Sequence, residues 1–246
     1  MKRLLFLLMM ISSSVYSQDT LSIDTVKLSE VTIQGIRAGS KTPVTQKTIT
    51  SSDIDRIYHT QELPMLLNTT PNVTSSTDGG HNMGYTSFRL RGIDQTRINM
   101  TLDGVPLNEP EDQGVYFSNY PDFTNSIKSM QIQRGVGTST NGVSSYAGSI
   151  SFESPTGLDK SSEAQIGYGS FNTYRVSAEN STGLMKNKMA FYTRYSTYAS
   201  DGYKYNSGGK GQSFFLSGGY YGSKDFVKVT AFSGHSVNQM AWFAVA

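Results

Sequence analysis

The sequence predicts a small α+β domain followed by the start of an antiparallel, transmembrane-type β-barrel. Two observations carry this prediction. Residues 44–155 hold short alternating stretches separated by Gly, Pro and Asp-Gly pairs, which is typical of small paired strands. Residues 156–246 hold five longer segments that each have one apolar and one polar face, which is typical of a barrel wall in a membrane.

Residues 1–17 predict a signal peptide. Lys2 and Arg3 precede an apolar run from Leu4 to Ile11, and small polar residues follow to Ser17. The run is too short to span a bilayer as a helix, and a buried N-terminal helix is the alternative. Without Lys2 and Arg3 the 21 basic residues become 19, which equals the 19 acidic ones. This balance indicates no nucleic-acid partner.

The composition and motifs argue against several kinds of chemistry. The chain has no cysteine, which excludes disulfides, thiolate catalysis and Cys-ligated metals. Its three histidines lie far apart and none has a partner at metal-ligand spacing. No phosphate-binding loop or catalytic triad is recognisable. We therefore expect no enzyme activity, no metal site and no cofactor. Charges and glycines interrupt every later apolar run, so a membrane crossing would need strands.

Residues 18–43 are polar and rich in Ser and Thr, and they predict a flexible extended segment. One island, from Leu28 to Gln34, alternates apolar and polar residues. A free segment of this kind can add as a strand to the sheet edge of a partner protein. The alternative is a plain linker strand.

The α+β domain begins with a predicted strand at residues 45–49 and two helical signals. Ser52 can cap a helix, with Asp55 three residues later. Residues 60–67 have helical spacing, and Pro64 suits a first helical turn. Asp103-Gly104 between alternating residues predicts a hairpin. Further strands are predicted at residues 88–90, 98–102, 127–132 and 150–152.

Two long polar loops, residues 74–85 and 108–116, are candidates for ligand contact. They carry acidic, amide and aromatic side chains. A calcium site on the second loop is an alternative to a solvated acidic turn, but the ligand spacing is not that of a calcium loop. The candidate contact residues are Asp78, His81, Asn82, Tyr85, Asn108, Glu109, Glu111, Asp112 and Tyr116.

The five segments of the last third are residues 163–169, 173–180, 188–198, 212–220 and 226–232. In the second of them, Tyr174 and Val176 lie opposite Arg175 and Ser177. A water-soluble antiparallel sheet would show the same alternation. Nine of the fifteen tyrosines fall in this part, many near predicted strand ends, which favours an aromatic girdle and a membrane.

Four motifs of the α+β domain together resemble the plug domain of TonB-dependent outer-membrane receptors. They are SFRLRGI at residues 87–93, TLDGVPL at 101–107, MQIQRGVGT at 130–138 and GSISFE at 148–153. The resemblance implies that residues 44–155 are a plug seated inside a barrel of about twenty-two strands, about five of which lie in residues 156–246. We therefore expect the chain to be the N-terminal piece of a longer receptor.

The resemblance also implies partners and site residues. A TonB box is expected at Glu30, Val31, Thr32 and Ile33, where an inner-membrane TonB-type energy transducer would bind. Arg89, Arg91 and Arg134 lie inside strand-type runs, and we expect them to form ion pairs with barrel carboxylates beyond this chain.

The implied activity is active import across the outer membrane of a scarce small-molecule ligand, such as an iron–siderophore complex. The plug would lie inside the barrel, and the barrel wall would contact outer-membrane lipid. The N-terminus would be periplasmic. A second hypothesis is a non-transporting outer-membrane binding or signalling protein with a plug-like domain. A soluble periplasmic enzyme is a third, which the missing catalytic residues disfavour.

Overall fold

The computed structural model describes residues 37–39, 41–79, 82–135, 145–223 and 225–241. These residues belong to one compact unit that spans residues 33–246. The predicted signal peptide at 1–17, the predicted TonB box Glu30–Ile33 and the candidate contact residue His81 lie outside the described residues.

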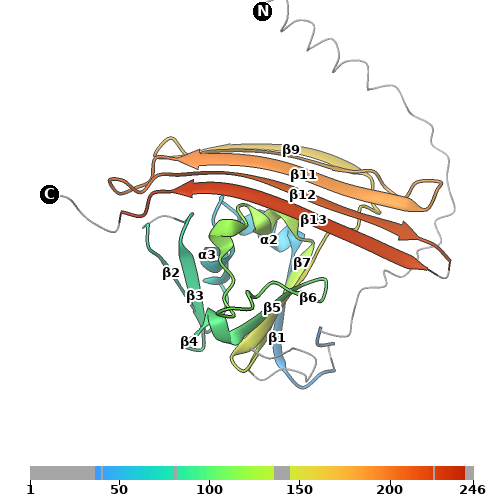
Figure 1. Ribbon diagram of the computed structural model, residues 1–246, viewed down its shortest axis with the longest axis horizontal. Helices are drawn as coiled ribbons and strands as arrows, with labels where there is room; N and C mark the ends of the chain where they lie inside the picture. The colour runs from blue at the N-terminus through green and yellow to red at the C-terminus, as the bar shows by residue number, and fades with distance from the viewer. Residues whose placement is uncertain (1–36, 40, 80–81, 136–144, 224, 242–246) are drawn as a thin grey trace, which may run out of the picture. The chain divides into compact units, whose positions relative to one another are not determined.

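The α+β domain is built on a mixed five-stranded sheet with the strand order β1-β7-β8-β5-β6. β5 and β8 are parallel, and the other neighbours are antiparallel. A smaller antiparallel sheet, β2-β3-β4, and two short helices, α2 and α3, complete the domain (Figure 1). The strands are β1 Thr45–Thr50, β2 Val73–Thr77, β3 Thr86–Leu90, β4 Ile93–Asp94, β5 Ile98–Leu102, β6 Val105–Pro106, β7 Ser129–Arg134 and β8 Gly148–Glu153. The helices are α2 Ser51–Ile57, α3 Leu63–Leu67 and the 3-10 turns η2 Gln95–Arg97, η3 Phe117–Asn119 and η4 Phe123–Ser126.

The predicted hairpin is confirmed. Leu102 pairs with Val105 across the turn between β5 and β6. Asp103 and Gly104 both have positive φ, at 50° and 88°. This is the backbone of a type I′ turn, whose twist matches that of the strands it joins.

The second helix is also confirmed, but the cap of the first was predicted two residues too late. α3 has Pro64 in its first turn and buries three leucines. α2 is capped by Thr50 rather than Ser52, and Asp53 rather than Asp55 completes the capping box. Thr50 ends β1 and starts α2 at once, so the strand leaves no room for a later cap. The first predicted loop is shorter than expected, because its residues 74–77 belong to β2.

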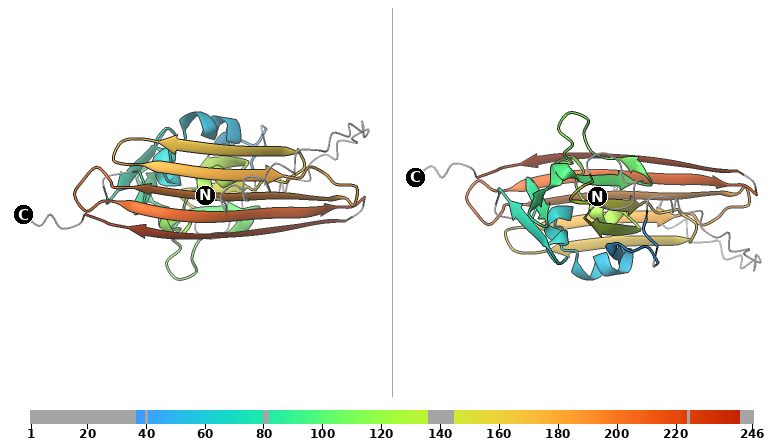
Figure 2. Two further views of the ribbon diagram at one scale, coloured as in Figure 1. Left: turned by 90° about the horizontal axis from the view of Figure 1, so that it is seen from above. Right: turned by 90° about the horizontal axis from the view of Figure 1, so that it is seen from below.

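The last third forms a second sheet of five antiparallel strands that follow one another in chain order, from β9 at one edge to β13 at the other. Figure 2 shows these strands side by side from above and the α+β domain beneath them. The predicted alternation is confirmed in β11, where every second residue is buried against the α+β domain. The strands are β9 Ser161–Tyr168, β10 Tyr174–Ser181, β11 Met189–Ser200, β12 Gly209–Tyr221 and β13 Phe226–Asn238.

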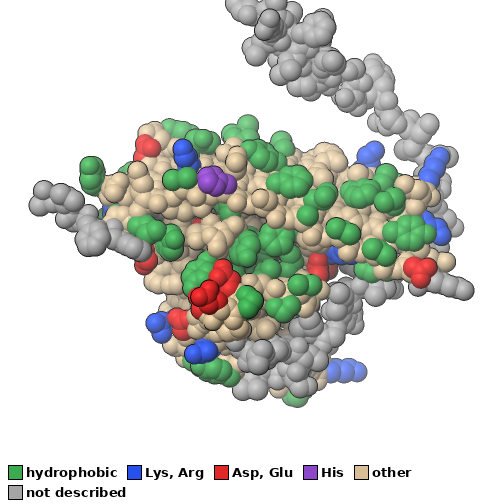
Figure 3. Space-filling view, in the orientation of Figure 1, with side chains coloured by type: hydrophobic (Ala, Val, Ile, Leu, Met, Phe, Trp, Pro, Cys, Tyr) green, Lys and Arg blue, Asp and Glu red, His purple; other side chains and the backbone are tan. Residues whose placement is uncertain are grey.

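The outer face of the β9–β13 sheet is apolar. Ile166 is 83% exposed, Val227 57% and Val229 62%, although each is a residue type that ordinarily packs in a core. Figure 3 shows hydrophobic side chains spread over this sheet, with its charged side chains mainly toward the two ends. An exposed apolar face of this kind suits a lipid environment.

The inner face of the β9–β13 sheet is not purely polar, as a polar barrel lumen would be. Phe215 and Tyr192 are buried in the same core as the α+β domain, and Phe232 packs against them. The Phe232 ring lies 5.6 Å from that of Tyr120. The Phe123 ring of the α+β domain lies 6.0 Å from that of Phe232. The aromatic contact therefore fastens the domain to the sheet through buried apolar surface.

Candidate functional site: the plug–sheet interface and two loops

Asp122 sits at the centre of the contact between the α+β domain and the β9–β13 sheet. It precedes η4 and has the left-handed backbone conformation, at φ 56°. The preceding Pro121 packs against Gly234 of β13, where an added Cβ would lie 2.3 Å from the proline ring. The glycine therefore lets this turn approach the strand closely and carries the carboxylate into the interface.

Two arginines of the sheet bind the Asp122 carboxylate. Arg175 of β10 donates from Nε to Oδ1 at 3.2 Å and from Nη2 to Oδ2 at 3.1 Å, which is a bidentate pair. Arg194 of β11 donates from Nη2 to Oδ2 at 2.7 Å and from Nη1 to Ser126 Oγ at 3.1 Å. The side chains of Arg175, Arg194 and Asp122 are 8%, 1% and 0% exposed.

Neighbouring groups complete this buried network. The Tyr58 hydroxyl donates to Asp122, and the Arg175 guanidinium lies 5.1 Å from the centre of the Tyr58 ring. Glu179 lies near Arg194 at 3.9 Å and accepts from Tyr192. Burial alone would raise the pKa of Asp122, but the charges of Arg194 and Arg175 outweigh burial and hold it below its ordinary value.

Glu62 is the second buried carboxyl of the domain, and it organises the first loop. Its Oε1 accepts from the Gly84 N–H at 2.9 Å, and its Oε2 accepts from the Thr86 hydroxyl at 2.6 Å. Its own N–H donates to the Asn82 carbonyl at 2.9 Å. Among the described residues no cation pairs with it, and burial raises its pKa to about 7, against the lowering effect of the two hydrogen bonds.

The hydrogen bonds of the buried Glu62 therefore hold the first loop in place. Its ends close through the Asp78 N–H, which donates to the Tyr85 carbonyl at 3.0 Å. Asp78, Asn82 and Tyr85 point to solvent, and Tyr85 is 43% exposed. These three predicted contact residues are thus exposed to solvent, and their contact with a ligand stays a prediction.

The second loop is ordered by Asn108. Its Oδ1 accepts from the Met100 N–H at 2.7 Å, and its Nδ2 donates to the carbonyls of Ile98 and Gln113. This predicted contact residue supports the loop from inside, and Glu109 is half-buried beside it. Three other predicted residues are exposed: Glu111, Asp112 and Tyr116.

Hydrogen bonds within the second loop also hold the Asp112 carboxylate and shift its pKa. The Gly114 N–H donates to Asp112 Oδ1 at 2.7 Å, and the Tyr116 hydroxyl donates to Oδ2. The bond from Tyr116, and then that from Gly114, lower the pKa of Asp112 below its ordinary value. In the part of the chain that the structure describes, no group of His, Cys, Asp and Glu side chains is arranged to hold a metal ion.

Both loops lie toward the same end of β13. Gly84 packs against Asn238, where an added Cβ would be 3.1 Å from the amide carbon. Ser236 donates to the Ser118 carbonyl at 2.8 Å, just after the second loop. At the other end of β13, Lys228 pairs with Asp103 at 3.2 Å. The sheet strands thus have one end beside the loops and one end beside the β5–β6 turn.

The three arginines predicted to pair with barrel carboxylates lie elsewhere on the domain. Arg89 donates to the Gly92 carbonyl and Arg134 to the Pro71 carbonyl, each at a long 3.4 Å. The Arg91 guanidinium lies over Gly135, 3.0 Å from where a Cβ would stand. Within the described ranges none of the three pairs with a carboxylate, so their pairing with further wall residues stays a prediction.

The sequence reasoning missed the Asp122 network, in which the acid lies on the domain and the arginines on the sheet. One signal for it was present. Arg175 was placed on the polar face of its segment together with Ser177, and a charge on an inward row needs a partner. The identity of that partner had no signal in the sequence, because Asp122 lies in an irregular turn.

Comparisons with known proteins agree with this architecture. The family model of the TonB-dependent receptor plug domain matches residues 38–149. No curated protein matches the sequence. In the described part of the chain, no helix has the length and apolar character needed to cross a membrane.

Three solved structures share the fold at low sequence identity. The copper transporter OprC is 17% identical with a TM-score of 0.64, over 82% of this chain and 33% of that one. The ferripyoverdine receptor of the outer membrane of Pseudomonas aeruginosa is 14% identical with a TM-score of 0.62, over 78% and 25%. The siderophore receptor PiuA from Acinetobacter baumannii is 16% identical with a TM-score of 0.60, over 79% and 26%.

The chain thus spans between a quarter and a third of the length of these receptors, and its five-stranded sheet matches the start of their barrels. The predicted fold class is confirmed. The matched family is one of transporters and not of enzymes. Residues 38–149 thus match the plug domain of TonB-dependent receptors, and the plug with its following sheet shares its fold with the start of TonB-dependent outer-membrane receptors.

Proposed function

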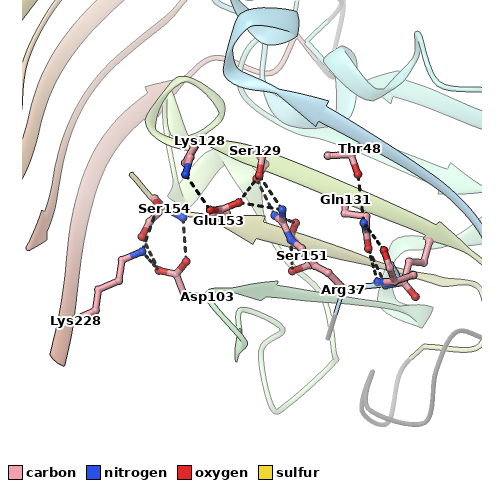
Figure 4. Close-up of polar contacts among 12 residues, drawn as sticks. Arg37, Thr48, Asp103, Lys128, Ser129, Gln131, Ser151, Glu153, Ser154 and Lys228 are labelled. Carbon is pink, nitrogen blue, oxygen red and sulfur yellow. Dashed lines mark hydrogen bonds and ion pairs between the residues drawn. The ribbon is translucent and has the colours of Figure 1, made fainter. Parts of the chain in front are cut away.

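We propose that the chain is part of an outer-membrane receptor that imports a scarce small molecule, using energy from an inner-membrane TonB-type protein. The observation that carries this proposal is the polarity of the plug. Its two exposed loops lie toward the Asn238 end of β13, whereas Arg37, the first described residue, binds Glu153 toward the Lys228 end (Figures 1 and 4). A ligand-binding side and an energy-receiving side are thereby separated along the strands.

The separation has the scale of a membrane. Ser236 is eight residues further along β13 than Lys228, which corresponds to about 26 Å of strand. The apolar band of outer-membrane barrels is about 25 Å tall. The apolar outer face of the β9–β13 sheet supports the same placement. We accordingly place the plug inside the barrel, its two loops toward the cell exterior and its N-terminus in the periplasm, after export through the signal peptide at residues 1–17.

The ligand class we propose is an iron–siderophore complex. Two of the three receptors compared above are named for siderophore ligands and one for copper. The exposed carboxylate, amide and phenol groups of the two loops offer hydrogen-bond partners to a polar chelate. The contact residues would be Asp78, Asn82, Tyr85, Asn108, Glu109, Glu111, Asp112 and Tyr116, together with His81, which lies outside the described residues.

We propose Glu30, Val31, Thr32 and Ile33 as the segment that the TonB-type protein grips. The acidic residue and the alternating β-branched side chains suit an added strand, in which backbone hydrogen bonds supply the affinity. These residues precede Arg37, which is the first described residue of the plug.

The test is Ile33→Pro in the full-length protein, with Ile33→Val as the matched control. Proline removes one ladder N–H and should abolish uptake of radiolabelled iron–siderophore while surface binding stays intact. Valine keeps both the donor and the β-branched shape, so its uptake should equal that of the wild type. Normal uptake by the proline variant would refute the assignment. Growth of a gene-deletion strain on single iron sources would identify the chelate.

A further inference from the structure

Arg37 binds the plug sheet through every part of its guanidinium. Nη1 donates to Ser129 Oγ at 2.8 Å and to Glu153 Oε2 at 3.1 Å. Nη2 donates to the backbone carbonyls of Ser151 at 2.8 Å and Ser129 at 3.2 Å. Nε donates to Ser151 Oγ at 3.4 Å. One side chain thereby joins the end of β8 to the start of β7 (Figure 4).

The next residue adds a reciprocal backbone contact. The Ala38 N–H donates to Gln131 Oε1 at 2.7 Å, and Gln131 Nε2 donates back to the Ala38 carbonyl at 3.1 Å. Ala38 is buried at 6% exposure. Arg37 and Ala38 therefore lie on the face of β7 and β8 that carries Ser129, Gln131 and Ser151. We call these two residues the clasp.

The two faces of β7 and β8 differ in chemistry. The face under the clasp is made of hydroxyl and amide side chains. The opposite face carries Met130, Ile132, Ile150 and Phe152, all within the apolar core. Lifting the clasp exposes groups that water can hydrogen-bond, whereas opening the core exposes apolar surface. The clasp is thus the attachment that comes away at the smaller cost.

The clasp also borders the contact between plug and sheet. Glu153, which binds Arg37, is followed by Ser154, and the Ser154 N–H and hydroxyl donate to Asp103. Lys228 of β13 donates to the Ser154 carbonyl at 3.2 Å and pairs with Asp103. Glu153 keeps a second cation, Lys128 at 3.4 Å, when Arg37 leaves. Removal of the clasp therefore leaves no buried carboxylate without a partner.

We propose that Arg37 and Ala38 form a detachable clasp on the polar face of β7 and β8, which can come away from that face without opening the plug core. The inference rests on the proposed function in one respect: the energy transducer supplies the pull on the clasp. Among the described residues, the hydrogen bonds of the clasp are the first to resist the pull.

The test places a nitroxide label at Gly39→Cys in the full-length protein in outer-membrane vesicles. The chain has no cysteine of its own, and an added Cβ at Gly39 meets only Thr42 Oγ1 at 3.9 Å. Arg37→Gln removes the charge and most donors, and should raise the ratio of mobile to immobile label about tenfold or more. Arg37→Lys should do nearly the same, because one ammonium cannot reach the acceptors that a planar guanidinium does.

The matched control is Arg56→Gln, which removes an exposed arginine whose contacts with Asp53 and with the Ser52 carbonyl both lie within α2. Its label should stay as immobile as that of the wild type. Amide exchange in β1 should stay slow in Arg37→Gln, because the core remains closed. An immobile label in Arg37→Gln, a wild-type spectrum in Arg37→Lys, or loss of β1 protection would each overturn the clasp. None of these readouts requires transport. If the wild type fails in uptake while the label is released in Arg37→Gln, the proposed function is refuted and the clasp is not.

Discussion

Asp122 and Glu62 are two acidic residues of the same plug, each 6% exposed as a whole residue, and the pKa values of their carboxyl groups move in opposite directions. Asp122 has two arginines of the sheet within hydrogen-bond distance, and its pKa falls. Among the described residues, the Glu62 carboxyl accepts from a hydroxyl and a backbone N–H, and its pKa rises to about 7. Both residues are buried. The neighbouring charges and hydrogen bonds therefore decide whether the ionised carboxyl stabilises or destabilises the folded plug.

The two acids therefore affect stability in different pH ranges. The folded pKa of Asp122 is below its ordinary value of 3.8, so its contribution is full above about pH 4 and is lost as the pH falls through the lowered pKa. The folded pKa of Glu62 is raised from 4.5 to about 7, so the folded plug retains a proton that the unfolded chain releases. Its contribution is therefore most favourable below pH 4.5 and is lost as the pH rises through about 7.

The largest effect should come from Asp122→Asn. The amide keeps the shape of the side chain but leaves Arg175 and Arg194 buried without their carboxylate. Breaking a buried pair in this way costs about 3–5 kcal/mol. The measurement is urea-induced unfolding of the plug in the full-length protein at pH 7, followed by hydrogen exchange of β7 and β8.

Glu111→Gln is the matched control for that variant, because Glu111 is exposed and the same acid-to-amide change is made. Its unfolding midpoint should not move. If Asp122→Asn behaves like this control, Glu179 and the nearby hydroxyls already compensate the two arginines. The difference between Asp122 and Glu62 would then not arise from the arginine pairs.

Glu62→Gln should have the next largest effect and the opposite sign. Above pH 7 it removes a charge whose burial costs up to about 3 kcal/mol, since one pKa unit corresponds to about 1.4 kcal/mol. The Thr86 hydroxyl can turn to accept from the new amide, so the loop contact survives. We expect the variant to unfold at higher urea than the wild type at pH 8 and at nearly the same urea at pH 4.5.

The decisive quantity is the slope with pH. The wild type should lose plug stability between pH 4.5 and 7, and Glu62→Gln should lose less. Equal slopes for the two proteins would mean that Glu62 titrates normally in the folded plug, with water or a cation reaching it through the first loop.

How much of this could be read from the sequence depends on the distance over which each signal acts. Asp103-Gly104 and the helix around Pro64 follow from neighbours within a few residues, and both were predicted. The alternation of β11 follows from one strand packing on one surface. Asp122 lies 53 residues from Arg175 and 72 from Arg194, and nothing local in its turn marks it. Only the packing of the plug on the sheet brings them together.

The same reasoning explains why the acid of the interface lies on the plug and the arginines on the sheet, although the opposite arrangement was predicted. The plug motifs drew attention to Arg89, Arg91 and Arg134 because charges within strand-type runs are conspicuous. The single aspartate in an irregular turn is not conspicuous, and the arginines that bind it lie on strands with an ordinary polar face. A charge inside a periodic element is easy to notice, whereas its partner is found only in three dimensions.

The smallest effect on the described contacts should come from Arg134→Ala, which separates the two groups of arginines. Arg134 is half-buried at the end of β7, and it donates a long hydrogen bond to the Pro71 carbonyl. Its removal should leave plug unfolding in urea almost unchanged, unlike Asp122→Asn. If a carboxylate of a further wall strand pairs with it, the plug should seat less firmly and the outer membrane should admit a large glycopeptide antibiotic more readily. A drop in the inhibitory concentration with unchanged plug unfolding is the expected result. A shifted unfolding midpoint with a tight membrane would instead make Arg134 an internal support of the plug.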